Sequence, residues 1–555
     1  MLLYRYTRFF AAQLTRDERI VRFHTWMLHC GVDLEAQGLS ISVCEGEKGL
    51  GVVTTKAIEA GQRVLTVPRK AMMTGDDVAK SPLGPIIESM PMLQQMPMFS
   101  MALYLIGQVH AANTAGGGSV GAAASAAQAA ELQSATPAAA GEPFPCSRVL
   151  QSSGSAVTMQ LRGGARPVAA DVTQLKAGSK WRPYLAMLPR TLTCVLYWSV
   201  ADLQALVGAR SSGALLAFSA LRFVRSAVKH YTVLHSALIT GLPSAQKQAS
   251  AAGLTAASFT WSSYRWALSV VMSRQNMVPS ALDEGRNTLA FVPGWDLLNH
   301  EDTAAGKITT SYAGGSGSKR RAVIQSGSLL LEAVRAFRAG EEVTMFYGRR
   351  PNRELMQFSG FSLDCSKWDA PLIELPAPGA TDPLAKVRRL ILGNLGLKVS
   401  PAVAAVGADT GAIVMPLVDV PPPPHSHSHG DSCGSGCGHS HAAAEDSDPP
   451  APTISTCVWS YARVMVCDKA QLGELLALGR GLTEVPPLGS CLSTGGPQAE
   501  AEAAVLLHGH VQKWLEEHPT GSPDGDDGCE VGSHINVFLQ SQRTAVQAVL
   551  SALSS

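Results

Sequence analysis

FVPGWDLLNH at residues 291–300 and FRAGEEVTMFYGRRPNRELMQFSGFSLD at residues 337–364 carry the pattern from which the fold is predicted. Taken separately, each has an ordinary structural interpretation. FRAGEE indicates a turn followed by an edge strand, and Tyr347 marks the end of that strand. Trp295 fits a packed aromatic residue, and the Asn-His pair that closes the first stretch fits a capping pair. Neither stretch by itself identifies a functional site.

The order of elements along the chain indicates an α+β protein. Short β-branched stretches separated by glycines predict strands over residues 39–75 and again between residues 287 and 348. Apolar residues at helical spacing predict helices over residues 200–270 and in the ordered parts from residue 384 onward. Strands and helices do not alternate, and no Gly-x-Gly-x-x-Gly or Walker loop follows a strand, which disfavours a doubly wound Rossmann sheet.

The composition permits a folded protein and argues against several classes. Of 555 residues, 46% are hydrophobic and 16% are charged, which is enough apolar material for a core. The net charge of +1 disfavours a protein that binds nucleic acid over its whole surface. No apolar run approaches the ~20 residues of a membrane-spanning helix. Eleven scattered cysteines, an odd number, favour a reducing compartment over a disulfide framework.

Two segments have the composition of flexible insertions. Residues 111–178 are rich in Ala, Gly, Ser and Pro, and residues 419–452 combine proline runs with a His/Gly/Ser/Cys tract. The ligand spacing in that tract does not match a closed zinc site, and its Gly/Ser filler gives no scaffold, so no metal is assigned. Five residues are candidates for weak metal binding only: His425, His427, Cys433, Cys437 and His439.

Considered together, the two stretches resemble a known family. Asp-x-x-Asn-His at residues 296–300, followed by Glu-Glu-Val-x-x-x-Tyr-Gly at residues 341–348, resembles the SET-domain protein methyltransferases. GLGVVTTKAIEAGQRVLTVPRKAMMT at residues 49–74 resembles the opening strands of that family. WRPYLAMLP at residues 181–189 resembles the start of the helical insert in the branch typified by the Rubisco lysine methyltransferases.

Within that branch, the chain resembles the actin-histidine N-methyltransferases more than the lysine-directed enzymes. Lysine-directed relatives carry Ser-Arg followed by an aromatic residue two positions on, whereas Asn276 stands at that position here. GKITTSY at residues 306–312 and FYGRRPNRE at residues 346–354, with the later SGF, also agree with the histidine-directed enzymes.

The resemblance implies a β-rich SET fold with a pseudoknot and a helical insert, followed by a mostly α-helical substrate-binding domain of the Rubisco LSMT type. Its divisions are an N-terminal helical segment at 1–38, the SET domain at 39–348 with an insertion at 111–178 and a helical insert at 179–262, a cofactor-contacting post-SET segment at 349–365, and a helical domain at 366–555 with the insertion at 419–452.

The resemblance also implies the cofactor S-adenosyl-L-methionine and the residues around it. Tyr347 and Asn276 are the expected catalytic residues, Tyr347 with its hydroxyl close to the transferring methyl and Asn276 orienting an imidazole ring. Backbone groups of Asn299 and His300 would hold the amino-acid end of the cofactor, and Phe361 would stack on adenine. The expected cofactor contacts are Arg274, Asp296, Leu297, Leu298, Asn299, His300, Ser359, Gly360, Phe361, Pro82, Leu83 and Gly84, and the expected substrate contacts are Gln275, Trp295, Tyr312 and Arg350.

One departure from the family pattern leaves alternatives open. An arginine that contacts the cofactor follows the opening Gly-x-Gly in the family, and Val53 stands at that position. Either another cation such as Lys56 compensates, or cofactor affinity is reduced. The alternatives to an actin-histidine enzyme are a protein-lysine N-methyltransferase acting on Rubisco or another non-histone protein, and a non-catalytic SET scaffold, which Val53 motivates. We expect a monomer without nucleic-acid or membrane partners, in the cytoplasm, with the nucleus and the chloroplast as alternatives.

Overall fold

The computed structural model describes most of the chain. Tyr312, the five candidate metal ligands and most of both low-complexity segments lie outside the described residues. The described residues are 16–44, 49–114, 179–190, 192–208, 211–283, 285–302, 306–310, 327–364, 366, 368–379, 381–398, 412–419, 453–478, 483–517 and 530–554.

Strands from two distant parts of the chain form three small sheets. Their strand orders are β1-β2-β10-β7, β3-β9-β8 and β4-β6-β5. Strands of residues 39–74 therefore pair with strands of residues 276–345, which confirms the predicted return to β-structure after the helices. The bounds are β1 Leu39–Val43, β2 Leu50–Thr54, β3 Arg63–Pro68, β4 Met73–Thr74, β5 Asn276–Pro279, β6 Asn287–Phe291, β7 Asn299–His300, β8 Gly306–Thr310, β9 Ser328–Ala333 and β10 Glu342–Met345.

Strand β10, which lies in residues 337–364, pairs with β7, which lies in residues 291–300. It pairs in parallel with β7, with Thr344 opposite Asn299 and Met345 opposite His300. On its other edge it pairs antiparallel with β2, with Glu342 opposite Val53. The strand is thus held between two neighbours, and the chain leaves the sheet at its end, just before Tyr347.

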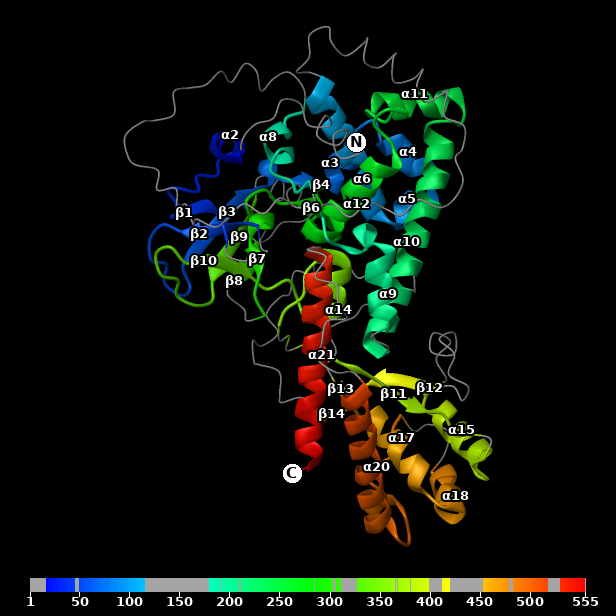
Figure 1. Ribbon diagram of the computed structural model, residues 1–555. Helices are drawn as coiled ribbons and strands as arrows, with labels where there is room; N and C mark the ends of the chain where they lie inside the picture. The colour runs from blue at the N-terminus through cyan, green and yellow to red at the C-terminus, as the bar shows by residue number, and fades with distance from the viewer. Residues whose placement is uncertain are drawn as a thin grey trace.

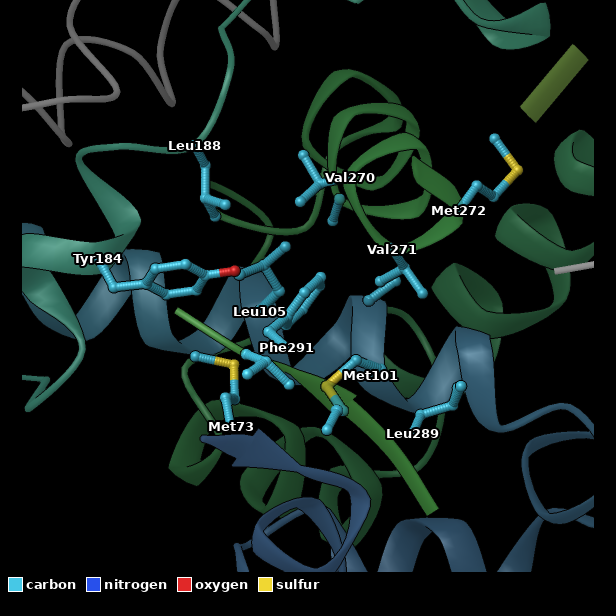
Figure 2. Packing of buried hydrophobic residues seen from close by; sticks show 14 of the residues in the cluster. Met73, Met101, Leu105, Tyr184, Leu188, Val270, Val271, Met272, Leu289 and Phe291 are labelled. Atoms are coloured by element: carbon cyan, nitrogen blue, oxygen red, sulfur yellow. The ribbon is translucent and has the colours of Figure 1, made fainter. Parts of the chain in front are cut away.

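Helices cover these sheets and form the insert between them. Helix α6 packs along α12, and Figure 2 shows side chains of both, including Leu105 and Val271, meeting Phe291 of β6 in the core. This core excludes water from the elements that carry the site. The bounds are α2 Arg16–His29, η3 Arg69–Ala71, α3 Gly75–Lys80, α4 Gly84–Ser89, α5 Pro91–Gln95, α6 Pro97–Thr114, α8 Arg182–Leu185, η5 Val195–Tyr197, α9 Val200–Gly208, α10 Ser211–Leu238, α11 Pro243–Ala251, α12 Trp261–Arg274 and η6 Trp295–Leu297.

Two predicted insertion boundaries are wrong by a few residues. The sequence predicts a structureless segment from residue 111, but α6 continues to Thr114. Ala112 is buried in the core, and alanine has the highest helix propensity, so the helix extends into the alanine-rich stretch. Asp419, predicted to open the second insertion, belongs to β13 Val418–Asp419, which pairs with β14 Thr453–Ile454.

The C-terminal region has a hydrophobic core of its own and is mostly helical, as expected. It also contains two two-stranded sheets, β11-β12 and β13-β14, that the sequence did not predict. The last helix, α21, contributes Phe538 to the first core and Val546 to the second, and Figure 1 shows it running from beside α14 to beside α20. The bounds are α14 Asn352–Glu354, η7 Leu355–Ser359, β11 Leu372–Pro376, α15 Ala385–Asn394, β12 Ala412–Pro416, α17 Thr456–Val466, α18 Lys469–Ala477, α19 Leu488–Cys491, α20 Gly496–Glu517 and α21 Glu530–Ser554.

Among the described helices, none combines the length and the apolar character that crossing a membrane requires.

Candidate active site

Tyr347 lies where the segment of residues 337–364 contacts the segment of residues 291–300. Its backbone N–H donates to His300 Nδ1 at 3.1 Å. Its hydroxyl donates to the backbone oxygen of Leu298 at 2.7 Å. Both partners belong to the segment that ends in β7, so the pairing of β7 with β10 positions this tyrosine.

The His300 side chain fixes the backbone of Tyr347 by a hydrogen bond. Its Nε2 lies 3.1 Å from Asp302 Oδ1, and its side chain is 1% exposed. Because Nδ1 accepts the N–H of Tyr347, the ring proton is assigned to Nε2, which donates to the carboxylate. The imidazole centroid lies 5.0 Å from the Tyr347 ring and 6.0 Å from the Phe361 ring. The His300 ring is therefore fixed by hydrogen bonds at both of its nitrogens and by packing against the rings of Tyr347 and Phe361.

The Tyr347 hydroxyl stays protonated at neutral pH. Burial is the main cause and raises its pKa to about 12. The nearby charges oppose one another, since Arg274 and Arg350 lower the pKa while Asp296 and Glu342 raise it. The residue consequently offers a neutral, oriented hydroxyl to its surroundings, and it is not a phenolate base.

Arg274 and Asp296 belong to the same buried network. Arg274 ends α12, and its guanidinium donates to the backbone oxygen of Asp296. The hydroxyl of Tyr184, from α8, donates to the carboxylate of Asp296. Burial raises the pKa of Asp296 to about 6, although Arg274 and the Tyr184 hydroxyl act in the opposite direction. The turn η6 is thus fixed through both the backbone oxygen and the carboxylate of Asp296. The Leu298 carbonyl, which accepts a hydrogen bond from Tyr347, follows directly after this turn.

The raised pKa of Asp296 gives a testable pH dependence. Between the ordinary value of 3.8 and about 6, the folded chain keeps a proton at Asp296 that the unfolded chain has released. The contribution of this group to stability is therefore intact at low pH and falls by about 3 kcal/mol as the pH rises through that window. We expect the free energy of unfolding of Asp296→Asn, relative to the parent chain, to rise by this amount between about pH 4 and pH 7. Urea titrations across that range measure it, and a difference that does not change with pH would contradict the assignment.

Asn276 and Gln275 follow Arg274 directly and are placed by the end of the helix. Gln275 caps α12 through its N–H, which donates to the Val271 oxygen at 3.0 Å. Asn276 begins β5, is half-buried, and its Nδ2 donates to the Arg274 oxygen at 3.2 Å. The amide predicted to select the substrate is therefore attached to the same network as Asp296 and Tyr347.

The Asn299 side chain is held by a hydrogen bond to Glu342 and lies against Gly51. Its Nδ2 donates to Glu342 Oε1 at 2.7 Å. A Cβ atom at Gly51 would lie 2.9 Å from that nitrogen and 2.3 Å from Cys44 Sγ, so only glycine fits there. Lys56 lies elsewhere, against Gly38, with its Nζ 3.4 Å from the Ala36 oxygen. Lys56 is therefore not brought into the Tyr347 cluster, and its compensation for Val53 stays a prediction; Arg274 and Arg350 are cations that act on Tyr347.

The segment Ser359–Phe361 closes another side of the site. The π-helix η7 ends at Gly360, whose φ of +84° favours glycine. Thr193 Oγ1 donates to the Gly360 oxygen at 2.6 Å, and a Cβ atom at Gly360 would lie 2.3 Å from Thr193 Oγ1. The half-buried Phe361 ring lies 6.3 Å from the Tyr347 ring, so the predicted adenine contact does stand beside the predicted catalytic residue.

Other predicted residues are not brought into this cluster. The Trp295 side chain is 0% exposed and packs in the core, so no substrate reaches it in this conformation. Pro82 and Leu83 line a cavity of about 220 Å³ between α6 and α11, and none of the residues lining that cavity belongs to the Tyr347 cluster. Their predicted cofactor contacts, and that of Gly84, stay predictions, as does the role of Tyr312.

Three residues of the network were not among the predicted site residues. Glu342 holds Asn299, Asp302 holds His300, and Tyr184 holds Asp296. Glu342 lies inside the Glu-Glu-Val motif and Tyr184 inside WRPYLAMLP, so the motifs include both residues, but the motif pattern assigns neither side chain a role. Across the described residues, no group of three or more His, Cys, Asp or Glu side chains could hold a metal ion.

The chain is similar to proteins named actin-histidine N-methyltransferase. It is 27% identical to that of Gallus gallus over 389 residues, which are 70% of this chain and 50% of the relative. It is 27% identical to that of Homo sapiens over 358 residues, which are 64% of this chain and 45% of the relative. The chain thus spans about half the length of these curated relatives. No protein-family model matches it.

Solved structures agree on the fold. The SET domain of LSMT bound to MeLysine and AdoHcy has a TM-score of 0.51 at 15% identity, covering 98% of this chain and 92% of that chain. Rubisco LSMT bound to sinefungin and monomethyllysine has a TM-score of 0.50 at 16% identity, with coverage of 98% and 92%. The resemblance inferred from residues 291–364 is therefore confirmed: the chain has the SET-domain fold, and its sequence is similar to the actin-histidine N-methyltransferases.

Proposed function

We propose that this chain is an S-adenosylmethionine-dependent protein methyltransferase that transfers a methyl group to a histidine side chain of actin. The observation that carries the proposal is the fixation of Tyr347 by Leu298 and His300 within a SET fold. The names of the sequence relatives support the actin histidine as target. Such a substrate would place the enzyme in the cytoplasm, and a monomer would be sufficient, since all the residues of the network come from one chain.

The residues present fit the proposed cofactor, which is positively charged and carries an adenine ring. Asp296 Oδ1 is buried and has no hydrogen-bond partner among the described residues, so the network has spare acceptor capacity beside a cationic ligand. The half-buried Phe361 ring provides an aromatic face next to His300. Arg274, residues 296–300 and residues 359–361 are the groups that would hold the cofactor, which supplies an electrophilic methyl group when bound.

The residues of the chain would orient the reacting groups and exclude water from them. Leu298 fixes the direction of the Tyr347 hydroxyl, whose oxygen can still accept a weak contact from the reacting centre. Asn276 would bond one imidazole nitrogen and present the other, unprotonated nitrogen as the nucleophile. Alignment of the nucleophile with the methyl carbon lowers the barrier because the entropy of orientation is already lost on binding.

Protonation separates histidine from lysine as a target. A free histidine has a pKa near 6.5, so at about pH 7 most of it is already the neutral nucleophile. A free lysine, near 10.4, must lose a proton at a cost of about 4.6 kcal/mol at that pH. A lysine enzyme has to offset this cost, whereas a histidine enzyme mainly needs an orienting group such as the Asn276 amide. The lysine alternative is kept because the solved structures of this fold include complexes with lysine derivatives.

A non-catalytic scaffold is the alternative from a different functional class, and its motivation is Val53. Titration calorimetry with S-adenosylhomocysteine separates the two, because a scaffold without cofactor affinity would show no heat of binding.

Transfer of a tritiated methyl group from the cofactor to unmethylated actin tests the proposal. We expect label to appear in actin with the parent chain and to be strongly reduced with Tyr347→Phe. Labelling that is equal with both chains would remove Tyr347 from the mechanism.

A further inference from the structure

A buried polar cluster joins the C-terminal helix to the segment after the candidate active site; we call it the Asn352 cluster, made of Asn352, Asp369 and Ser541. The backbone N–H of Asn352 donates to Asp369 Oδ1 at 2.6 Å, and its Nδ2 donates to Asp369 Oδ2 at 3.0 Å. Ser541 Oγ donates to Asp369 Oδ2 at 2.7 Å and accepts from Asn352 Nδ2 at 3.1 Å. All three residues are buried, at 0%, 7% and 3% exposure respectively. A carboxylate at this depth depends on such donors.

The cluster ties together the two ends of the segment that carries Phe361. Leu363 N–H donates to Asn352 Oδ1 at 2.8 Å, and Asn352 Nδ2 donates to the Leu363 oxygen at 2.8 Å. Between these residues lie α14, η7 and Gly360. Asp369 also satisfies an N–H of the first helical turn, which has no partner inside the helix. The place of Ser359–Phe361 therefore depends on Asn352.

The residue before Asp369 contacts both flanks of Tyr347. The Trp368 ring centroid lies 5.9 Å from that of Phe346. The Arg349 guanidinium lies 5.0 Å from the Trp368 ring centroid on its face. One short stretch of chain, residues 368–369, thus supports the Tyr347 turn on one side and the Phe361 segment on the other.

Ser541 reaches this cluster because α21 is anchored in the first core. Ile535 and Phe538, located before Ser541 on the same helix, are buried among the residues of that core. Figure 1 shows α21 passing beside α14, while its later part lies beside α20 in the C-terminal region. The helix that completes the C-terminal core therefore also donates a hydrogen bond at the base of the candidate cofactor site.

We propose that Asn352, Asp369 and Ser541 are positioning residues that fix Ser359–Phe361, so that α21 sets the affinity of the cofactor site. The inference rests on the proposed function for its cofactor, and it concerns residues that touch neither cofactor nor substrate. It assigns the C-terminal region a part in cofactor binding besides the recognition of a protein substrate.

The test compares Ser541→Ala with Ser551→Ala in the full chain. Both substitutions remove one hydroxyl from α21, but Ser551 is exposed, and within the described part of the chain its hydroxyl bonds only the Gln547 oxygen of its own helix, at 3.1 Å. We expect Ser541→Ala to raise KM for S-adenosylmethionine about 5- to 10-fold and to change kcat less than about 2-fold, since it removes one hydrogen bond to a charged group. The Leu363 amide should exchange with deuterium faster in Ser541→Ala and unchanged in Ser551→Ala.

A second variant tests the contribution of the negative charge of Asp369. Asp369→Asn keeps the shape and removes the negative charge, and we expect the same direction of change in KM and in the exchange of the Leu363 amide. Equal KM values and equal exchange rates in Ser541→Ala and Ser551→Ala would overturn the inference. A parent chain that binds no cofactor would instead overturn the proposed function, and the exchange of the Leu363 amide would still decide whether the cluster positions this segment.

Discussion

Replacing Tyr347 with phenylalanine is expected to lower kcat about 10²- to 10³-fold, the range typical for loss of one oriented hydroxyl at a reacting centre. Cofactor affinity should change less than about 3-fold, because the ring and its contacts with His300 and Phe361 are kept. The hydroxyl that is lost is protonated at neutral pH, since burial raises its pKa to about 12, and it is aimed by the Leu298 oxygen at 2.7 Å. Single-turnover rates and calorimetric titration measure the two quantities separately.

Tyr461→Phe is a matched control for this variant. The Tyr461 hydroxyl, like that of Tyr347, donates to a backbone oxygen, here that of Pro376, at the same distance of 2.7 Å, and Tyr461 is buried whereas Tyr347 is half-buried. Its loss should cost similar stability without reducing kcat, because Tyr461 lies in the C-terminal core. Full activity in Tyr347→Phe would remove the hydroxyl from the mechanism, and an equal loss in Tyr461→Phe would mean that the effect arises from stability.

Replacing Asn276 with phenylalanine is expected to shift target preference from histidine toward lysine. Asn276 stands at the start of β5, directly after Arg274, and its amide is the group proposed to bond an imidazole nitrogen. An aromatic ring there removes that partner and supplies an apolar wall that favours a neutral amine. The ratio of kcat/KM for histidine over lysine peptides should fall about 10- to 100-fold, as expected when a buried hydrogen bond to substrate is lost.

Asn276→Ala separates the two effects of that substitution. It removes the amide without adding an aromatic wall, so histidine turnover should fall while lysine turnover does not rise. An unchanged ratio in Asn276→Phe would contradict the role given to Asn276, whatever the alanine variant does.

The central pairing of the fold was predictable because its signals are local. The glycine-punctuated strands of residues 39–74 and the motif around Tyr347 each carry a pattern that can be recognised within about ten residues. The structure places Arg274, Asn276, Asp296, His300 and Tyr347 in one connected network.

The remaining features depend on contacts that no local pattern encodes. Tyr184 meets Asp296 across 112 positions, and Asp369 meets Ser541 across 172 positions. In strands β11 and β12 the alternation of buried and less buried residues covers only the last four residues of each strand, which is the lower limit for predicting a strand from a period of two. The burial of Trp295 is likewise set by tertiary packing, because an aromatic residue before an acidic one fits a core and a binding surface equally well.

Locating the methyl group by mass spectrometry decides whether this chain methylates a histidine of actin. The full chain, S-adenosylmethionine and unmethylated actin would be incubated together, and the digested actin would be searched for modified residues. We expect one methyl group on the ring of a single actin histidine, formed by the parent chain and not by Tyr347→Phe. Cofactor binding without any methylated actin histidine, or methylation of lysine residues alone, would contradict this expectation.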